Sequence, residues 1–378
     1  MAPASLLRRD VLALTAAAAL ANGVPAQAGA RPVPYRYSYQ PPLRQSAAQK
    51  GIYYGACVSP TWLDVMKDTS REYEPDFSKA FARECNILVG EGATKWNALH
   101  PEPDRWNFTQ ADLLLEYADA HDMKMRGHTL IWHASFPEWA QNLLIEGKGE
   151  ALMETYIYTV VSHFKGRLHS WDVVNEALRP RHRFFEEGFR DTPWLKALGP
   201  GYIERAFRLA AQADPDVQLV YNDYDIESRP VKAQGAIKLL RDLRAKGVPV
   251  HAVGLQGHFD TDTTFDHLDG FCAEMKSLGV EVIITEMDVF EANAGLDDRQ
   301  TDLRVAAKTR EFLDRIFSVA VPKQILTWGL SDRHSWLSSA KWNAWRNPAG
   351  RHIRGLPLDD NLHRTAMWGV IDDFIGKI

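Results

Sequence analysis

Two stretches of this chain decide its fold: Ser170-Trp171-Asp172-Val173-Val174-Asn175-Glu176 and Val280-Glu281-Val282-Ile283-Ile284-Thr285-Glu286. Each stretch is rich in β-branched residues, has about the length of one strand and is followed by a loop. This pattern is typical of a parallel strand that is buried on both faces. In a barrel of such strands, the catalytic residues lie at the carboxyl ends. Because each stretch ends in a glutamate, Glu176 and Glu286 form a candidate catalytic pair; the alternative is two ordinary solvated or helix-capping side chains.

Strand-like and helix-like segments alternate along the rest of the chain. Eight apolar runs of strand length lie near residues 51–58, 86–90, 124–130, 169–175, 217–222, 251–256, 280–286 and 324–329. Segments with a helical pattern cover 111–120, 151–164, 202–213, 233–243, 265–278 and 303–319. This alternation predicts a single α/β domain folded as a (β/α)₈ TIM barrel. A doubly wound open sheet is the alternative, but no glycine-rich phosphate loop follows the first run.

The amino-terminal region has the features of an export signal. Arg8-Arg9 precede an Ala-rich apolar stretch and the small-residue sequence Ala26-Gln27-Ala28. This arrangement resembles a twin-arginine signal peptide, so we expect cleavage after residues 1–28 and a periplasmic or secreted mature protein. The apolar stretch is too short to span a bilayer, so we expect no membrane anchor. We expect a flexible leader over 29–48 and the barrel over 49–378; an uncleaved, disordered amino-terminus is the alternative to a signal.

Composition and cysteine usage narrow the classes of partner and cofactor. Charged residues make up 25% of the chain and the net charge is −5, so no polybasic surface is predicted and we expect no nucleic-acid partner. The odd count of three cysteines leaves at least one free thiol, and a bridge between Cys57 and Cys85 stays open. No Cys/His spacing resembles a zinc site, and His128 and His133 fall on opposite faces of a strand. We expect a monomer without metal or organic cofactor.

Polar and aromatic residues follow seven of the eight apolar runs. The candidates at these strand ends are Glu91, Lys95, His128, Trp132, Asn175, Glu176, Tyr224, Gln256, His258, Glu286, Asp288, Trp328 and Trp336. A single His or Trp in such a place is more often part of the core or rim, but so many strands ending this way predict a functional site. A pair of carboxyl groups is typical of a glycosidase, in which one protonates the leaving oxygen and the other attacks the anomeric carbon.

Five segments in the same order resemble glycoside hydrolase family 10, the retaining endo-β-1,4-xylanases. They are RGHTLIWH (126–133), WDVVNE (171–176), GLQGHF (254–259), ITEMDV (284–289) and TWGLSDRHSW (327–336). The resemblance runs from about Gly51 to Trp336. It implies cleavage of internal β-1,4-xylosidic bonds in a polysaccharide substrate by double displacement, without a cofactor.

The resemblance also assigns roles to the catalytic residues. Glu176 matches the acid/base and Glu286 the nucleophile. In the family pattern a histidine and an aspartate support the nucleophile, and His258 and Asp288 match them here. Gln256 is expected to orient the acid/base. A negative charge on the nucleophile disfavours ionisation of a neighbouring carboxyl group, which would keep Glu176 protonated and ready to donate.

The remaining candidates match residues that bind the sugar chain. Asn175 matches a partner of the 2-hydroxyl at the cleavage site, and Lys95 and His128 match residues that hold another hydroxyl of the same sugar. Trp132, Trp328 and Trp336 match aromatic walls of the glycone side. Tyr224 matches a contact on the leaving-group side, and Glu91 belongs with the substrate-binding set.

Two positions depart from the family pattern on the glycone side. Gly92 and Ser135 stand where the family usually has an Asn and a Gln that hydrogen-bond the next sugar. The loss of each amide weakens that subsite by about 0.5–1.5 kcal/mol per net bond. These replacements are either tolerated chance changes or a sign of altered glycone recognition. The second interpretation favours short, exo-cleaved or uronic-acid-decorated xylo-oligosaccharides or another β-glycan as substrate.

The loop over 337–356 is longer than the family's usual loop and bears on the same choice. It contains Trp342, Trp345, Arg346, Arg351, His352 and Arg354. Its arginines would pair with an acidic substituent such as a uronic acid. The alternative is a solvated basic loop with its Trp side chains packed beneath it. A barrel that only binds carbohydrate is a third class, which the presence of both glutamates disfavours.

Overall fold

The computed structural model describes residues 40–63, 74–179, 188–339, 341 and 347–378. Within this part of the chain, eight parallel strands close into a barrel. They are β1 (Tyr53–Val58), β2 (Ile87–Gly90), β3 (Lys124–Ile131), β4 (Ser170–Asn175), β5 (Gln218–Asp223), β6 (Ala252–Leu255), β8 (Glu281–Phe290) and β9 (Gln324–Thr327). The β6–β8 and β1–β9 pairings complete the ring. The predicted (β/α)₈ barrel is therefore confirmed.

The strands are buried as the apolar runs predict. Every residue of β4 is buried, because helices cover the outside of the barrel and side chains fill its interior. One strand is longer than its apolar run. β8 continues to Phe290 because the short strand β7 (His258–Asp260) pairs with its second half, His258 with Asp288, outside the ring.

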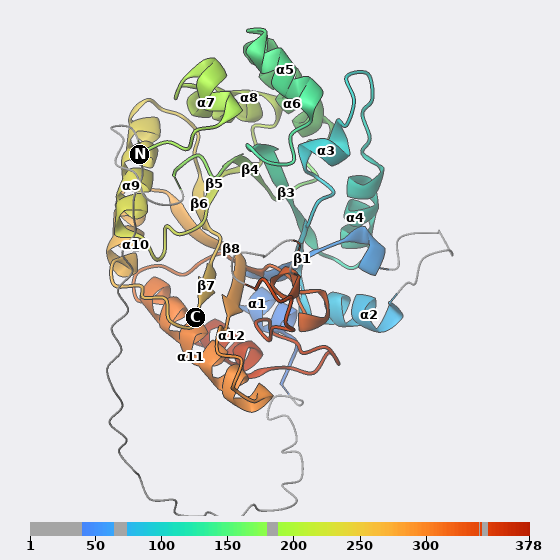
Figure 1. Cartoon of the computed structure of the whole chain (residues 1–378), viewed down its shortest axis with the longest axis vertical. Coiled ribbons are helices and arrows are strands. Elements are labelled where there is room, and N and C mark those ends of the chain that lie inside the picture. The colour runs from blue at the N-terminus through green and yellow to red at the C-terminus, as the bar shows by residue number, and fades with distance from the viewer. Residues whose placement is uncertain (1–39, 64–73, 180–187, 340, 342–346) are drawn as a thin grey trace, which may run out of the picture.

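The helices form an outer ring around the strands (Figure 1). They are α1 (Leu43–Gln49), α2 (Pro75–Glu84), α3 (Trp96–Leu99), α4 (Thr109–Ala120), α5 (Glu138–Ile145), α6 (Gly149–His163), α7 (Pro193–Leu198), α8 (Tyr202–Ala213), α9 (Pro230–Ala245), α10 (Leu268–Ser277), α11 (Asp298–Phe317) and α12 (Ala366–Gly376). α8 shows why they pack there: it buries Ile203, Ala206, Phe207 and Ala210, which share one helical face.

The domain begins earlier than the sequence predicted. α1 lies inside the expected leader, and its Leu43 and Ala47 are buried in the core. The expectation that the leader extends to residue 48 is therefore wrong. Composition concealed this helix because its burial depends on a distant partner: the Leu43 backbone N–H donates to Glu84 Oε2 at 3.1 Å. Residues 1–28, the predicted signal, lie outside the described residues, as do 29–39 of the predicted leader.

A buried carboxylate joins the two ends of the barrel domain. Glu84 is fully buried at the end of α2. It accepts hydrogen bonds from Arg364 Nη2 at 2.8 Å and Trp368 Nε1 at 3.1 Å, in addition to the Leu43 N–H. We call Glu84, Leu43, Arg364 and Trp368 the terminal clasp. Through it the carboxyl-terminal helix α12 is held against α1 and α2.

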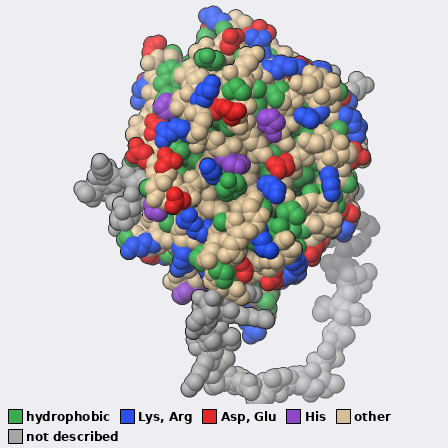
Figure 2. Space-filling view, turned by 180° about the vertical axis from the view of Figure 1, so that it is seen from behind, with side chains coloured by type: hydrophobic (Ala, Val, Ile, Leu, Met, Phe, Trp, Pro, Cys, Tyr) green, Lys and Arg blue, Asp and Glu red, His purple; other side chains and the backbone are tan. Residues whose placement is uncertain are grey.

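Two further features concern thiols and the surface. Cys57, Cys85 and Cys272 are all buried and free, so Cys57 and Cys85 are not bridged. On the face shown in Figure 2, acidic and basic side chains are interspersed. None of the helices in the described ranges is long and apolar enough to cross a membrane.

Candidate active site

A cavity of about 1090 Å³ opens at the carboxyl ends of the strands. Its walls contain eleven of the thirteen predicted residues: Glu91, Lys95, His128, Trp132, Glu176, Tyr224, Gln256, His258, Glu286, Trp328 and Trp336. The other two, Asn175 and Asp288, lie behind these walls and hydrogen-bond to residues in them. A second cavity, of about 780 Å³, adjoins Gln218, His251 and Glu281 at the amino ends of strands, and none of the predicted residues lines it.

Glu286 is held by donors on both carboxylate oxygens. Asn222 Nδ2 donates to Oε1 at 2.7 Å, and His258 Nε2 donates to Oε2 at 3.2 Å. His128 Nδ1 lies 3.8 Å from Oε1. Burial by itself raises the pKa of Glu286, but the electrostatic effect of His128 and the charges and hydrogen bonds of His258 and Asn222 outweigh it and lower the pKa to about 2. Glu286 is therefore a carboxylate at neutral pH, as a nucleophile must be.

His258 is fixed between two carboxylates. Its Nδ1 donates to Asp288 Oδ1 at 3.0 Å while its Nε2 donates to Glu286. Trp336 Nε1 donates to the other oxygen of Asp288 at 2.6 Å. Burial lowers the pKa of His258, but the charge and hydrogen bond of Asp288, together with those of Glu286, raise it to about 10. The predicted support of Glu286 by His258 and Asp288 is thus present as a continuous chain of hydrogen bonds.

Glu176 lies directly after β4 in an unusual backbone conformation. Its φ is +57°, a left-handed value that costs a non-glycine residue roughly 1 kcal/mol. Its backbone N–H donates to the carbonyl of Asn222 at 2.9 Å, which holds it in place. Strand-end geometry therefore turns this side chain from the barrel wall toward the cavity.

The two oxygens of Glu176 differ in their surroundings. Oε1 accepts hydrogen bonds from Asn175 Nδ2 at 3.2 Å and Gln256 Nε2 at 3.3 Å, as expected for an orienting Gln. Oε2 lies 3.6 Å from Arg190 Nη2 and 4.0 Å from His133 Nε2, and no described residue donates a hydrogen bond to it. One oxygen of Glu176 is thus held by two amides, while the other faces the guanidinium of Arg190 without a hydrogen bond from a described residue.

Asn222 links the two glutamates and was missed as a site residue in the sequence. Its Nδ2 donates both to Glu286 Oε1 and, at 2.9 Å, to Asn175 Oδ1, and its Oδ1 accepts from the Thr285 hydroxyl at 2.7 Å. A β-carbon at Gly254 would lie 2.3 Å from Asn222 Oδ1, so only glycine leaves room for this amide. The available signal was the position of Asn222 at the end of the fifth apolar run.

A second missed residue supports His128 from behind. His128 Nδ1 donates to Asp172 Oδ2 at 2.9 Å, and Arg126 also donates to Asp172. Asp172 and Arg126 are both buried inside the barrel. Asp172 is the polar residue inside an otherwise apolar run, which is the signal that identifies it in the sequence.

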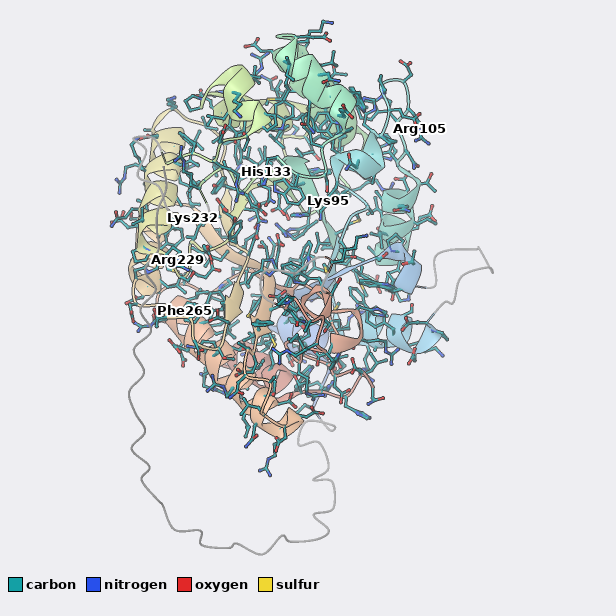
Figure 3. All side chains as sticks on the ribbon, viewed as in Figure 1. Lys95, Arg105, His133, Arg229, Lys232 and Phe265 are labelled. Carbon is teal, nitrogen blue, oxygen red and sulfur yellow. The ribbon has the colours of Figure 1, made fainter. Side chains whose placement is uncertain are left out.

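The glycone side is built around a lysine between aromatic walls. Lys95 Nζ lies 5.1 Å from the ring centre of Trp132 and 5.6 Å from that of Trp328. Figure 3 shows Lys95 and His133 toward the middle of the barrel and Arg105 at its periphery. Burial raises the pKa of the neighbouring Glu91, against the opposing charge of Lys95. Cation, carboxyl group and flat apolar faces together form a surface suited to sugar hydroxyls and sugar rings.

The space left by the two departures is open. A β-carbon at Gly92 would have nothing within 4 Å, and Ser135 lines the same cavity with φ +49°. Asn97, whose side chain is exposed, is the nearby amide on this wall of the cavity. The glycone side is therefore wider at Gly92 than a side chain would allow.

The long loop does not use its arginines as predicted. Arg354 donates two hydrogen bonds to Asp302, at 2.8 and 2.9 Å, so the expectation that it is free to pair with an acidic sugar is wrong. Arg351 donates to the carbonyl of Ala292 at 3.1 Å, and His352 pairs with Asp360. The predicted residues Trp342, Trp345 and Arg346 lie outside the described residues.

Cations surround the leaving-group side. The hydroxyl of Tyr224 accepts a hydrogen bond from Arg190 Nη2 at 2.6 Å, and Lys232 Nζ lies 3.8 Å from the centre of its ring. Lys232 is itself paired with buried Asp223 at 2.6 Å. Burial raises the pKa of Tyr224 to about 12, with Arg190 opposing and Glu176 adding to the rise. Tyr224 is therefore a neutral wall of the cavity at physiological pH.

Comparisons with known proteins agree with this geometry. The model of glycosyl hydrolase family 10 matches residues 42–372. An endo-1,4-beta-xylanase A of Thermoanaerobacterium saccharolyticum is 34% identical over 334 residues, covering 82% of this chain and 26% of that protein. An endo-1,4-beta-xylanase B of Thermotoga neapolitana is 33% identical over 307 residues, covering 78% of this chain and 83% of that protein.

A solved structure and the relative lengths complete the comparison. The crystal structure of xylanase 10B from Thermotoga maritima aligns with a TM-score of 0.76 at 33% identity, covering 89% of this chain and 98% of that one. The chain spans only about a quarter of the length of the first relative, so what that protein does as a whole is not carried over. The family match covers nearly all of the described barrel and includes both glutamates of the cavity. The chain belongs to glycosyl hydrolase family 10.

Proposed function

We propose that this protein is a retaining endo-β-1,4-xylanase in which Glu286 is the nucleophile and Glu176 the acid/base. One observation carries the proposal: two glutamates face one cavity and are joined through the side-chain amides of Asn222 and Asn175, but their hydrogen-bond partners differ. Both oxygens of Glu286 accept hydrogen bonds, whereas Glu176 keeps one oxygen without a close donor. These are the two states that double displacement requires.

The first step forms a glycosyl-enzyme. A carboxylate oxygen of Glu286 attacks the anomeric carbon, and the bond from that carbon to the leaving oxygen breaks. The proton on Glu176 goes to the leaving oxygen, so the departing chain leaves as a neutral alcohol. Before the attack, the hydrogen bond from His258 stabilises the negative charge of the Glu286 carboxylate. Afterwards the same Nε2 donates to the ester oxygen that is not bonded to the sugar.

The second step releases the sugar. Glu176, now a carboxylate, takes a proton from a water molecule as its oxygen attacks the anomeric carbon, and the bond to Glu286 breaks. Two inversions give net retention. Asn175 is placed to bond the 2-hydroxyl, a contact that strengthens in the transition state, and its Oδ1 is fixed by Asn222 and Gln256.

Retention is tested by proton NMR of xylohexaose hydrolysis at early times. We expect the β-anomer of the new reducing end to appear first and then mutarotate. Appearance of the α-anomer first would mean single displacement and would overturn the role of Glu286 as nucleophile.

The substrate class rests on the family and on the shape of the glycone side. The relatives described above are named as endo-1,4-beta-xylanases, which favours linear xylan. The open space at Gly92 favours a second candidate, a glycone substituted at the sugar beyond the cleavage site or a shorter chain. Product profiles on linear xylan, glucuronoxylan, xylo-oligosaccharides and a β-1,4-glucan separate these. A ladder of internal fragments from linear xylan supports the first candidate; turnover confined to short or uronic-acid-bearing substrates supports the second.

We infer from residues 1–28 that the protein is exported through a twin-arginine signal. The Arg8-Arg9 pair and the Ala26-Gln27-Ala28 sequence support this inference. Amino-terminal sequencing of protein recovered outside the cytoplasm tests it. We expect the mature chain to begin near Gly29, and a full-length chain retained in the cytoplasm would contradict it.

A further inference from the structure

The side chain of Arg190 contacts more catalytic groups on the leaving-group side than any role assigned so far explains. Its Nε donates to the backbone carbonyl of Glu176 at 2.9 Å, and its Nη2 donates to the Tyr224 hydroxyl at 2.6 Å. The same Nη2 lies 3.6 Å from Glu176 Oε2, and Nη1 lies 3.3 Å from His133 Nε2. One planar guanidinium thus meets the backbone and the carboxyl group of the acid/base and the wall of the leaving-group side.

The backbone next to Arg190 explains why it stays there. The Arg190 N–H donates to the carbonyl of Ala177 at 2.7 Å, and Leu178 and Phe189 form an antiparallel bridge. The chain that leaves the cavity after Glu176 is therefore paired with the chain that returns at Arg190. This pairing places the guanidinium beside Glu176 by backbone hydrogen bonds, independently of any substrate.

The contact to the Glu176 carbonyl acts on a strained residue. Glu176 holds a left-handed φ of +57°, and its peptide is tied on one side to Asn222 and on the other to Arg190. Because the direction of a side chain follows from its backbone, these two bonds set where the carboxyl group points. Removal of the Arg190 bond leaves Glu176 free to relax away from the leaving oxygen.

The charge of Arg190 acts on the same proton transfer. Negative charge develops on Glu176 as it gives its proton to the leaving oxygen, and a cation 3.6 Å from Oε2 stabilises that charge. His133 does not compete as a proton donor. Burial and the charge of Arg190 lower the pKa of His133 to about 4, so its neutral ring accepts from Arg190.

We propose that Arg190 is a positioning residue that couples the leaving-group sugar, through Tyr224, to proton donation by Glu176. The guanidinium of Arg190 donates both to the Tyr224 hydroxyl and to the Glu176 carbonyl. A sugar that binds against Tyr224 therefore fixes the guanidinium, and through it the position of Glu176. The inference rests on the assignment of Glu176 as the acid/base, but not on the identity of the sugar.

The test compares leaving groups in the full-length enzyme. Arg190→Met keeps the length of the side chain but removes the donors and the charge. We compare kcat/KM, which reports only the formation of the glycosyl-enzyme. On xylo-oligosaccharides, whose leaving alcohol needs a proton, we expect kcat/KM to fall by about 10- to 100-fold. On a dinitrophenyl glycoside, whose leaving group needs none, kcat/KM should change less than about threefold. Tyr224→Phe keeps the ring but loses the hydrogen bond from Arg190. It should show the same difference between the two substrate classes, with a smaller loss on xylo-oligosaccharides.

Two controls separate this role from a structural one. Arg179 Nε donates to the carbonyl of Phe189 at 2.7 Å in the same paired segment, so Arg179→Met perturbs that segment while the contacts of Arg190 with Glu176 and Tyr224 stay in place. We expect Arg179→Met to affect both substrate classes equally or not at all. Equal losses on both classes in Arg190→Met would overturn the proposal and make Arg190 a structural residue.

The outcome for the proposed function is read separately. If the wild-type enzyme does not cleave xylo-oligosaccharides, the same leaving-group comparison is made with aryl and alkyl glycosides of whichever sugar it accepts. A split on those substrates supports Arg190 even where the xylan assignment fails. If Glu176→Ala itself shows no leaving-group dependence, the acid/base assignment fails, and the Arg190 proposal fails with it.

Discussion

Glu286 and Glu176 are the same side chain at the ends of two strands of one barrel, yet their surroundings differ in kind. Glu286 accepts hydrogen bonds from an amide and from a histidine held by a carboxylate, and a second histidine lies 3.8 Å away. Glu176 is held on one oxygen by two amides, while a more distant arginine lies near the other. The comparison teaches that a barrel assigns acid and nucleophile through the partners around each carboxyl group, because the strand-end position is shared.

The largest expected effect comes from removing the nucleophile. Glu286→Ala should lower kcat by about 10⁴-fold or more, because no other described group is placed to form the glycosyl-enzyme. Added azide should then attack from the vacated side and restore turnover of an activated β-xyloside, giving the α-glycosyl azide. Product NMR checks the anomer. Substantial activity without azide would contradict the assignment.

The acid/base variant should differ from the nucleophile variant in its dependence on the leaving group and in its azide product. Glu176→Ala should lower turnover of xylan by about 10²- to 10⁴-fold and spare the glycosylation step on substrates with acidic phenol leaving groups. Here azide takes the place of the water that Glu176 activates, so the product should be the β-glycosyl azide. Obtaining opposite anomers from the two variants sharpens the comparison. The same anomer from both would show that the two roles are not separated as the surroundings indicate.

A smaller loss is expected when the amide that joins the two glutamates is removed. Asn222→Ala takes a donor from Glu286 and from Asn175 together, so kcat should fall by about 10- to 100-fold with less change in KM. Thr285→Val is the matched control, since it removes the hydroxyl that donates to Asn222 Oδ1 at 2.7 Å and to the Leu255 carbonyl at 3.2 Å but leaves the bond from Asn222 to Glu286 in place. We expect it to cost less than a tenth of the Asn222 effect. A larger effect for Thr285→Val would contradict the prediction, because it would show that the bonds from Asn222 to Glu286 and Asn175 are not the ones that matter for kcat.

The smallest effect is a change in pH dependence. His258→Asn removes a hydrogen bond and a charge that lower the pKa of Glu286, so the pH below which kcat/KM is lost should rise by about one to two units. A pH profile on an activated glycoside, which needs no proton from Glu176, measures this shift. An unchanged acidic limb would show that His258 does not set the charge of the nucleophile.

The same variant changes stability over a defined pH window. The pKa of His258 is raised from 6.5 to about 10, so its contribution is complete below pH 6.5 and lost as the pH rises toward 10. The pKa of Glu286 is lowered from 4.5 to about 2, so its contribution is complete above pH 4.5 and lost as the pH falls toward 2. The Tm difference between wild type and His258→Asn should therefore be largest between about pH 4.5 and 6.5.

Much of this site was predictable because chemistry and strand ends coincide in a barrel. Runs of β-branched residues indicate buried strands, and a polar residue directly after such a run faces the cavity. Glu176, Glu286 and His258 were found in this way. Asn222 and Asp172 stand within or at the end of such runs as well, and only their roles required knowledge of what they touch.

The remaining features depended on residues that are distant in sequence. Arg190 follows no strand, and it reaches Glu176 only because the returning chain pairs with Ala177 and Leu178. Arg354 belongs to a basic loop in the sequence, but in the structure its guanidinium pairs with Asp302 of α11. A local pattern cannot show which distant carboxylate satisfies a given cation.

The barrel, the order of its strands and the pair of glutamates follow from the sequence alone, because burial on both faces and strand-end polarity depend on residues that are neighbours in the chain. Where the domain begins is visible only after folding, since α1 is held through Glu84 in the terminal clasp. The tertiary structure also decides which charges surround each glutamate. Those charges come from side chains far apart in the chain, and their effect depends on separations of a few ångströms that folding alone sets.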